Sequence, residues 1–134
     1  MPPSIEQYLQ ELLGAIAASP IVRSSNVELD KRTARAALIC GELQFTESST
    51  LYFREPVELE AEVIRRMYSY HYQGEDASLV FRYDDTPHFP EVDSFPHHKH
   101  VGGESRAASS AAPDLRAVLH EIETIFPLRE RLQG

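Results

Sequence analysis

The chain has 134 residues, of which 42% are hydrophobic and 25% charged, a balance that excludes an intrinsically disordered or collagen-like protein. Its 13 Lys and Arg residues are outnumbered by 21 Asp and Glu residues, which gives a formal net charge of −8. Such an acidic chain does not fit a protein that coats nucleic acid, because such binders neutralise phosphates with many cations, although a local RNA-binding cleft stays compatible with it. The length predicts a single domain spanning residues 1–134.

The first predicted element is an amphipathic helix near the N-terminus. Ser4 can cap this helix, with Gln7 as the reciprocal partner of a capping box. Pro20 follows the helix and marks its end. Apolar residues recur between these points at helical spacing, at Ile5, Tyr8, Leu9, Leu12, Leu13 and Ile16. This apolar stripe needs a surface to pack on.

Residues 21–85 change to the alternating pattern of β-strands. We expect turns at residues 30–32, 46–49 and 74–76, and a strand over residues 33–45 in which Gly41 marks a bulge or a bend. Glu55 and Pro56 are expected to interrupt the next strand. Strands joined by short turns predict an antiparallel sheet of about five strands.

The clearest predicted strand covers residues 63–73, and another follows at residues 79–84. Alternation along residues 63–73 places Tyr68, Tyr70 and Tyr72 on one face and Arg65 on the other. Tyrosines in this pattern most often pack beneath a helix. The alternative is a platform on which nucleic-acid bases stack.

Residues 85–113 have no periodicity, and residues 102–112 are expected to form a mobile surface loop. A second amphipathic helix begins near Asp114, and Pro127 is expected to end it. The elements together predict an α+β fold in which the N-terminal and C-terminal helices pack on one face of the sheet. No apolar run approaches the roughly 18 residues that a membrane span needs, so we expect a cytoplasmic protein without a membrane partner.

Four of the six histidines lie close together, at His88, His97, His98 and His100. Because histidine contributes little to packing and is costly to bury when charged, this clustering favours a function. One interpretation is a site for a divalent metal such as zinc, although Lys99 would place a cation beside it. A second is acid–base catalysis without a metal. A third is a purely structural loop, whose imidazoles bind main-chain carbonyls.

Metal-independent cleavage of RNA needs a base, an acid and cations that offset the charge of the transition state. The four histidines can act as base and acid, and Asp84 can orient an imidazole. The sequence offers four candidates for binding the RNA, which are Arg65, Arg82, Lys99 and Tyr70.

Three segments resemble the TumE family, namely residues 68–72 (YSYHY), 82–88 (RYDDTPH) and 95–100 (FPHHKH). TumE proteins are classed as toxins of type II toxin–antitoxin modules, encoded beside a helix-turn-helix antitoxin. The resemblance therefore implies a toxin that acts on RNA or on the translation apparatus, with such an antitoxin as its partner. Asp85, Thr86 and Phe89 depart from the family pattern, Phe89 at a position where the family often has a second histidine. The site residues that the resemblance implies are Arg82, Asp84, His88, His97, His98 and His100.

These arguments lead to two hypotheses. The first is a toxin-like endoribonuclease that uses histidine acid–base chemistry and no cofactor. The alternative is a non-catalytic binding protein whose His-rich loop holds a divalent metal or a protein partner. The negative net charge suits a basic partner such as a DNA-binding antitoxin, because complementary fields speed encounter. The sequence leaves open whether the chain is an enzyme.

Overall fold

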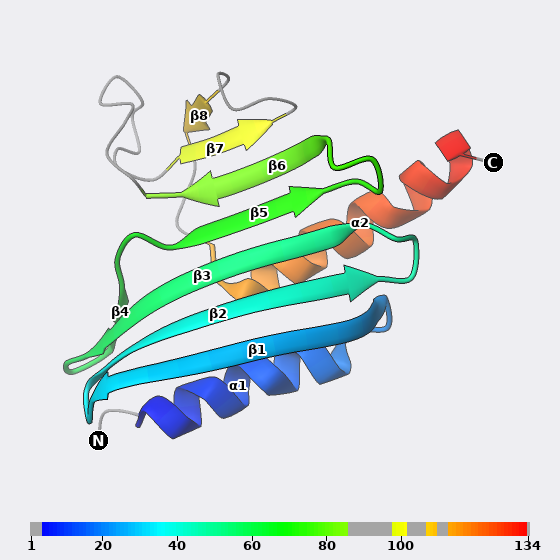
Figure 1. Ribbon diagram of the computed structural model, residues 1–134. Helices are drawn as coiled ribbons and strands as arrows, with labels where there is room; N and C mark the ends of the chain where they lie inside the picture. The colour runs from blue at the N-terminus through cyan, green and yellow to red at the C-terminus, as the bar shows by residue number, and fades with distance from the viewer. Residues whose placement is uncertain (1–3, 86–97, 102–106, 110–112, 134) are drawn as a thin grey trace.

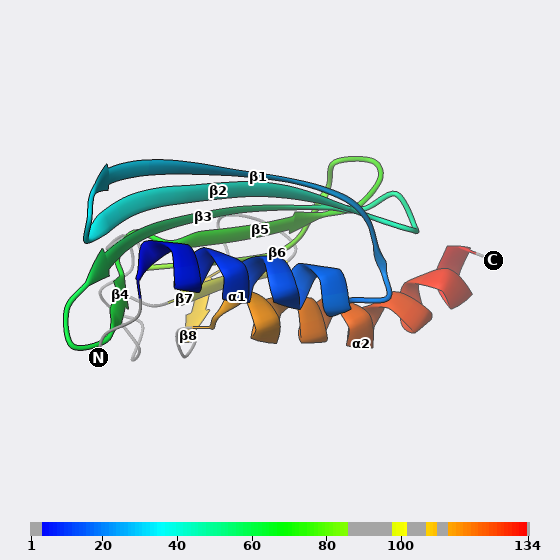
Figure 2. The ribbon, with the colours of Figure 1, turned by 90° about the horizontal axis from the view of Figure 1, so that it is seen from below.

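The computed structural model describes residues 4–85, 98–101, 107–109 and 113–133. Within these residues, two helices lie on one face of an antiparallel sheet (Figures 1 and 2), which confirms the predicted α+β fold. The helices are α1 (Ile5–Ala18) and α2 (Leu115–Gln133). The strands are β1 (Val22–Thr33), β2 (Ala36–Phe45), β3 (Thr50–Leu59), β4 (Val63–Arg65), β5 (Ser69–Gln73), β6 (Leu79–Asp84), β7 (His98–Val101) and β8 (Ala107–Ser109).

The sheet has more strands than the sequence predicted. Its order is β1-β2-β3-β5-β6-β7-β8, and β4 pairs with the end of β3, which makes eight strands in the described parts of the chain. Strands β7 and β8 lie in the segment without periodicity, and β8 falls inside the predicted loop at residues 102–112. The other residues of that predicted loop lie outside the described residues.

Several predicted boundaries were wrong because strand pairing overrides local signals. Strand β1 continues to Thr33, so its turn lies at residues 34–35 rather than 30–32. Strand β3 continues through Glu55 and Pro56, because the ladder to β5 ends at Arg54 and the ladder to β4 begins at Val57. The missing N–H of Pro56 therefore faces a gap between two ladders.

The predicted strand over residues 63–73 is broken into β4 and β5. Met67 adopts a left-handed conformation with φ of 58° between the two strands. The Met67 backbone N–H donates a hydrogen bond of 3.1 Å to the carboxylate of Asp85, at the end of β6. The break moves Arg65 to the side of Tyr70, whereas alternation along an unbroken strand placed these residues on opposite faces.

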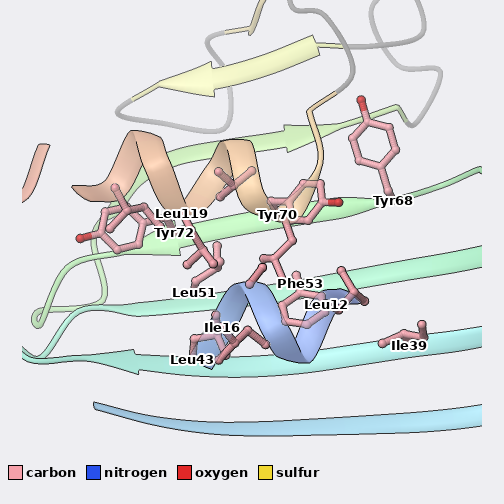
Figure 3. Packing of buried hydrophobic residues seen from close by; sticks show 14 of the residues in the cluster. Leu12, Ile16, Ile39, Leu43, Leu51, Phe53, Tyr68, Tyr70, Tyr72 and Leu119 are labelled. Carbon is pink, nitrogen blue, oxygen red and sulfur yellow. The ribbon is translucent and has the colours of Figure 1, made fainter. Parts of the chain in front are cut away.

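The hydrophobic core lies between the sheet and the two helices. Figure 3 shows Leu12 and Ile16 of α1 and Leu119 of α2 directed toward the strands. Tyr70 and Tyr72 are completely buried among these core residues. The tyrosine row is therefore core packing, and Tyr70, a candidate for binding RNA, offers no face on which a base can stack.

The capping box that the sequence predicted at the start of α1 is confirmed. The Ser4 hydroxyl accepts a hydrogen bond from the Gln7 backbone N–H, and the Gln7 side chain accepts one from the Ser4 N–H. At the other end of the chain, α2 continues past Pro127 to Gln133, beyond the predicted end. Pro127 removes one backbone hydrogen bond without ending the helix.

Candidate functional site

One candidate site lies on the sheet face opposite the helices, which we call the open face. Alternation along β6 directs Phe81 into the core and places Arg82 and Asp84 on the open face. In the adjacent ladder, His100 of β7 lies directly opposite Arg82. The Asp84 Oδ2 atom lies 3.2 Å from Arg82 Nε and 3.6 Å from His100 Nε2. We call these three residues the Asp84 cluster.

The Asp84 cluster combines a buried carboxylate with a guanidinium and an imidazole. The side chains of Asp84 and His100 are 2% and 7% exposed, whereas the Arg82 side chain is 32% exposed. Burial of a carboxylate is costly unless an opposite charge lies near it, and the Arg82 guanidinium supplies a charge of this kind. The arrangement therefore places an imidazole beside a buried carboxylate and a partly exposed cation.

The Asp84 cluster belongs to a longer row across the open face. Strand register places Tyr52 of β3, His71 of β5, Arg82 and His100 side by side. The Tyr52 and His71 rings contact each other edge to face, with centroids 6.3 Å apart. Tyr52 and His71 were not predicted as site residues. Pairing across the predicted turn at residues 74–76 would place His71 opposite Leu79, whereas the structure pairs it with Arg82.

A second polar cluster is buried on the helix side of the sheet. Glu55 of β3 is 0% exposed and accepts a hydrogen bond from the hydroxyl of Tyr8 in α1. The Arg65 Nη1 atom lies 2.7 Å from the Tyr70 hydroxyl, 2.6 Å from the Pro113 carbonyl and 3.9 Å from Glu55 Oε1. We call this set of residues the Glu55 cluster.

Burial controls the ionisation of the Glu55 cluster. Desolvation raises the pKa of Glu55, and the Tyr8 hydrogen bond and the nearby Arg65 charge oppose this shift. Desolvation and the Glu55 charge together raise the pKa of Tyr8 and of Tyr70 above the range in which they could exchange protons at neutral pH. This role of Glu55 was not predicted from the sequence, where the residue indicated only an interruption of the strand.

Lys99, another candidate for binding RNA, also faces the helices. Its ammonium lies 2.6 Å from the Glu121 carboxylate of α2 and 4.8 Å from the Tyr83 ring centroid. Arg65, Tyr70 and Lys99 therefore lie on the helix side of the sheet, whereas Arg82 and the rest of the Asp84 cluster lie on the open face. The structure divides the predicted site between two faces.

Comparison with protein families gives a match to the family described as Toxin TumE over residues 11–131. The chain belongs to the TumE family. This match confirms the resemblance of residues 68–72, 82–88 and 95–100, and extends it over the N-terminal half, where the sequence motifs were not specific. Searches of curated proteins and of solved structures found no match.

Membership in the TumE family indicates a toxin and implies an antitoxin partner. Two of the histidines that this family resemblance selected, His88 and His97, lie outside the described residues. The backbone of His98 is described, and it lies opposite Asp84 in the β6–β7 ladder. This register brings residues 98–100, the described part of one TumE motif, beside residues 82–84 of another.

Two absences apply to the described part of this TumE chain. No group of three or more His, Cys, Asp and Glu side chains within it could hold a metal ion. Neither of its helices has a stretch long and apolar enough to cross a membrane.

Proposed function

We propose that this TumE-family toxin cleaves RNA by acid–base chemistry without a metal ion, at the open face beside β6 and β7. The observation that supports this proposal best is the Asp84 cluster, in which one buried carboxylate oxygen lies within 3.6 Å of both an imidazole and a guanidinium nitrogen. A carboxylate–imidazole pair with an adjacent cation supplies the groups that phosphodiester cleavage requires.

In the proposed reaction, a general base removes the proton from the 2′-hydroxyl of the RNA, and the 2′-oxygen attacks the adjacent phosphorus. The bond from phosphorus to the 5′-oxygen then breaks, and a general acid protonates that leaving oxygen. The products are a 2′,3′-cyclic phosphate and a free 5′-hydroxyl. The His100 imidazole, held by Asp84, is one of the two proton-transfer groups in this scheme. Arg82 offsets the negative charge that develops on the phosphate.

The histidines of residues 88–98 supply the second proton-transfer group in this proposal. His98 is the first candidate, because its backbone is opposite Asp84. His88 and His97 are assigned from the sequence motifs alone. We assign no metal to the site. The partner we propose is a helix-turn-helix antitoxin, and the site of action is the cytoplasm, where RNA is available to a toxin.

The test is induced expression of the wild type, His100→Asn and Asp84→Asn, scored by growth and by mapping of RNA ends. We expect the wild type to arrest growth and to leave RNA fragments with 5′-hydroxyl ends. The purified protein should produce the same ends in the presence of a chelator. General acid–base groups contribute about 10²–10⁴-fold to a rate, so both variants should lose most of the cleavage. His120→Asn is the matched control, because His120 is exposed on α2, on the other side of the sheet.

Other results would overturn the proposal. Cleavage that requires a divalent metal contradicts the mechanism, and full cleavage by a folded His100→Asn variant contradicts the site. Growth arrest with intact RNA supports instead the alternative of a non-catalytic protein that acts by binding. A His97→Ala, His98→Ala double variant tests the loop histidines in the same assay, and its loss of toxicity is expected. Thermal melting of each variant separates loss of chemistry from loss of fold.

A further inference from the structure

A second feature of the open face is a groove lined by three arginines. The groove has a volume of about 250 Å³, and Arg32, Arg54 and Arg66 line it together with the apolar side chains of Leu38 and Pro56. Glu58 is the acidic residue in the lining. Three of the 13 basic residues therefore surround one groove on a chain with a net charge of −8. We call this feature the arginine groove.

The guanidinium groups of the arginine groove are only weakly held. Arg32 pairs with Asp30 at 2.9 Å, but the two side chains are 65% and 61% exposed, and such surface pairs are weak. Arg54 donates a long hydrogen bond of 3.4 Å to the Met67 carbonyl. Arg66 is exposed, and none of the residues that the structure describes forms an ion pair with it. All three cations can therefore turn toward an anionic ligand.

Strand register connects the arginine groove to the Asp84 cluster. Arg54 of β3 lies opposite Ser69 of β5, and Ser69 lies opposite Asp84 of β6. Neighbouring strands are about 4.8 Å apart, so the backbones at Arg54 and Asp84 are separated by about 10 Å. One short polynucleotide can span this distance along the open face.

The charged and aromatic side chains on the rest of the open face favour one direction for a bound polynucleotide. Strands β1 and β2 carry Glu28 and Glu42, which line an acidic hollow on the far side of Arg54 from β6. Tyr52 lies on β3 two residues before Arg54, is 41% exposed, and has Glu42 of the hollow opposite it on the β2 side. On the β5 side, in the direction of β6, its ring contacts His71. An exposed aromatic ring can stack on a base, and the acidic hollow repels phosphates.

We propose that the arginine groove is a binding subsite for the phosphates of single-stranded RNA, which runs from this groove past Tyr52 toward the Asp84 cluster. Guanidinium groups suit this role because they donate paired hydrogen bonds to phosphate oxygens. That RNA is the ligand rests on the proposed function. The groove itself follows from the arginines, the apolar floor and the register.

The test is binding of a fluorescein-labelled single-stranded RNA of twelve mixed-sequence nucleotides, measured by anisotropy at several salt concentrations in the Asp84→Asn background, so that the RNA stays intact. We expect Arg54→Gln, Arg66→Gln to raise the Kd at least about tenfold, and to lower the slope of log Kd against log salt by about 1.4, which is about 0.7 for each lost phosphate contact with a single strand. Arg23→Gln, Arg116→Gln is the matched control, since it removes two exposed arginines outside the groove. We expect this control to change the Kd less than about twofold.

The single variant Arg66→Gln keeps the proposal testable if the double variant unfolds, because the Arg54 hydrogen bond to Met67 stays intact. Equal weakening by the groove variant and the control would overturn the proposal, since it would show only a general charge effect. Unchanged RNA binding with weakened antitoxin binding would assign the groove to the protein partner, which also overturns it. If the wild type cleaves RNA and the groove variant binds RNA normally, the subsite is contradicted and the proposed function is still supported. If RNA binding depends on the groove but the wild type does not cleave RNA, the subsite is supported and the proposed function is contradicted.

Discussion

Glu55 is a buried carboxylate on β3 that connects the sheet to α1 through a hydrogen bond. It is 0% exposed, it accepts a hydrogen bond from Tyr8, and Arg65 lies 3.9 Å away. Burying a charge is costly, and one cationic neighbour at this distance offsets the cost only in part, so the pKa of Glu55 is raised. A buried ionisable group of this kind makes the stability of the fold depend on pH.

The raised pKa of Glu55 predicts a specific pH profile of stability. Between the ordinary pKa of 4.5 and the higher folded-state pKa, folded Glu55 keeps a proton that it has lost in the unfolded chain. The contribution of Glu55 is therefore fully present below its ordinary pKa of 4.5, and is lost as the pH rises through the folded-state value. Glu55→Gln keeps an acceptor for Tyr8 and removes this titration. We expect the urea-unfolding free energy of Glu55→Gln, relative to wild type, to rise with pH above 4.5, by at most about 1.4 kcal/mol per pH unit.

Glu58→Gln is the control for this comparison, because Glu58 lies on the same strand and is exposed. Comparing the two variants removes effects that are common to replacing any glutamate on this strand. Parallel profiles for Glu55→Gln and the wild type would show that Glu55 does not titrate differently in the folded chain.

At the scale of single elements, β2 shows how one small residue permits close packing. Gly41 lies opposite Phe53 of β3, and a Cβ atom added to Gly41 would lie 2.2 Å from the Phe53 ring. The ladders from β2 to β1 and to β3 are continuous at this point, so Gly41 forms no bulge. The glycine is needed because the Phe53 ring lies over its backbone.

Gly41→Ala is therefore expected to destabilise the protein. Phe53 is 3% exposed and surrounded by core residues, so its ring has little room to move away from a methyl group. Overpacking of this kind costs about 1–3 kcal/mol, which urea unfolding of the variant can measure. Gly14→Ala is the control, since a Cβ at Gly14 in α1 meets nothing within 4 Å. That control should be neutral or stabilising, by up to about 1 kcal/mol. A Gly41→Ala variant as stable as the wild type would show that the ring relaxes freely.

The elements that the sequence predicted well are those whose signals are local. The capping box at Ser4 and Gln7 and the buried tyrosine row depend on residues a few positions apart. The continuation of β3 through Pro56 depends instead on the gap between two ladders, which involves three strands. The break at Met67 depends on a hydrogen bond to Asp85, eighteen residues away. Neither of these long-range contacts can be inferred from local alternation.

At the scale of the whole molecule, long-range contacts that local alternation does not reveal also explain why the predicted site is divided between two faces. Arg82 and Asp84 lie on one face of β6 because they are two residues apart, and the β6–β7 ladder brings His100 beside them. Nothing local showed that Arg65 and Lys99 face the helices, because that depends on the break at Met67 and on Glu121 of α2. The arginine groove was missed because its three arginines come from β1, β3 and the segment after β4.

The net charge of −8 leads to the last prediction, which concerns the antitoxin. If that partner is a basic, DNA-binding protein, long-range attraction should accelerate its association with the toxin, and salt should screen this effect. We expect the association rate, measured by stopped-flow fluorescence, to fall at least about tenfold between low and high salt. Arg54→Gln, Arg66→Gln makes the toxin more acidic and should associate no more slowly than the wild type, although its RNA binding is weakened. A rate that does not change with salt would contradict electrostatic steering, and slower association of the groove variant would place the antitoxin on the open face.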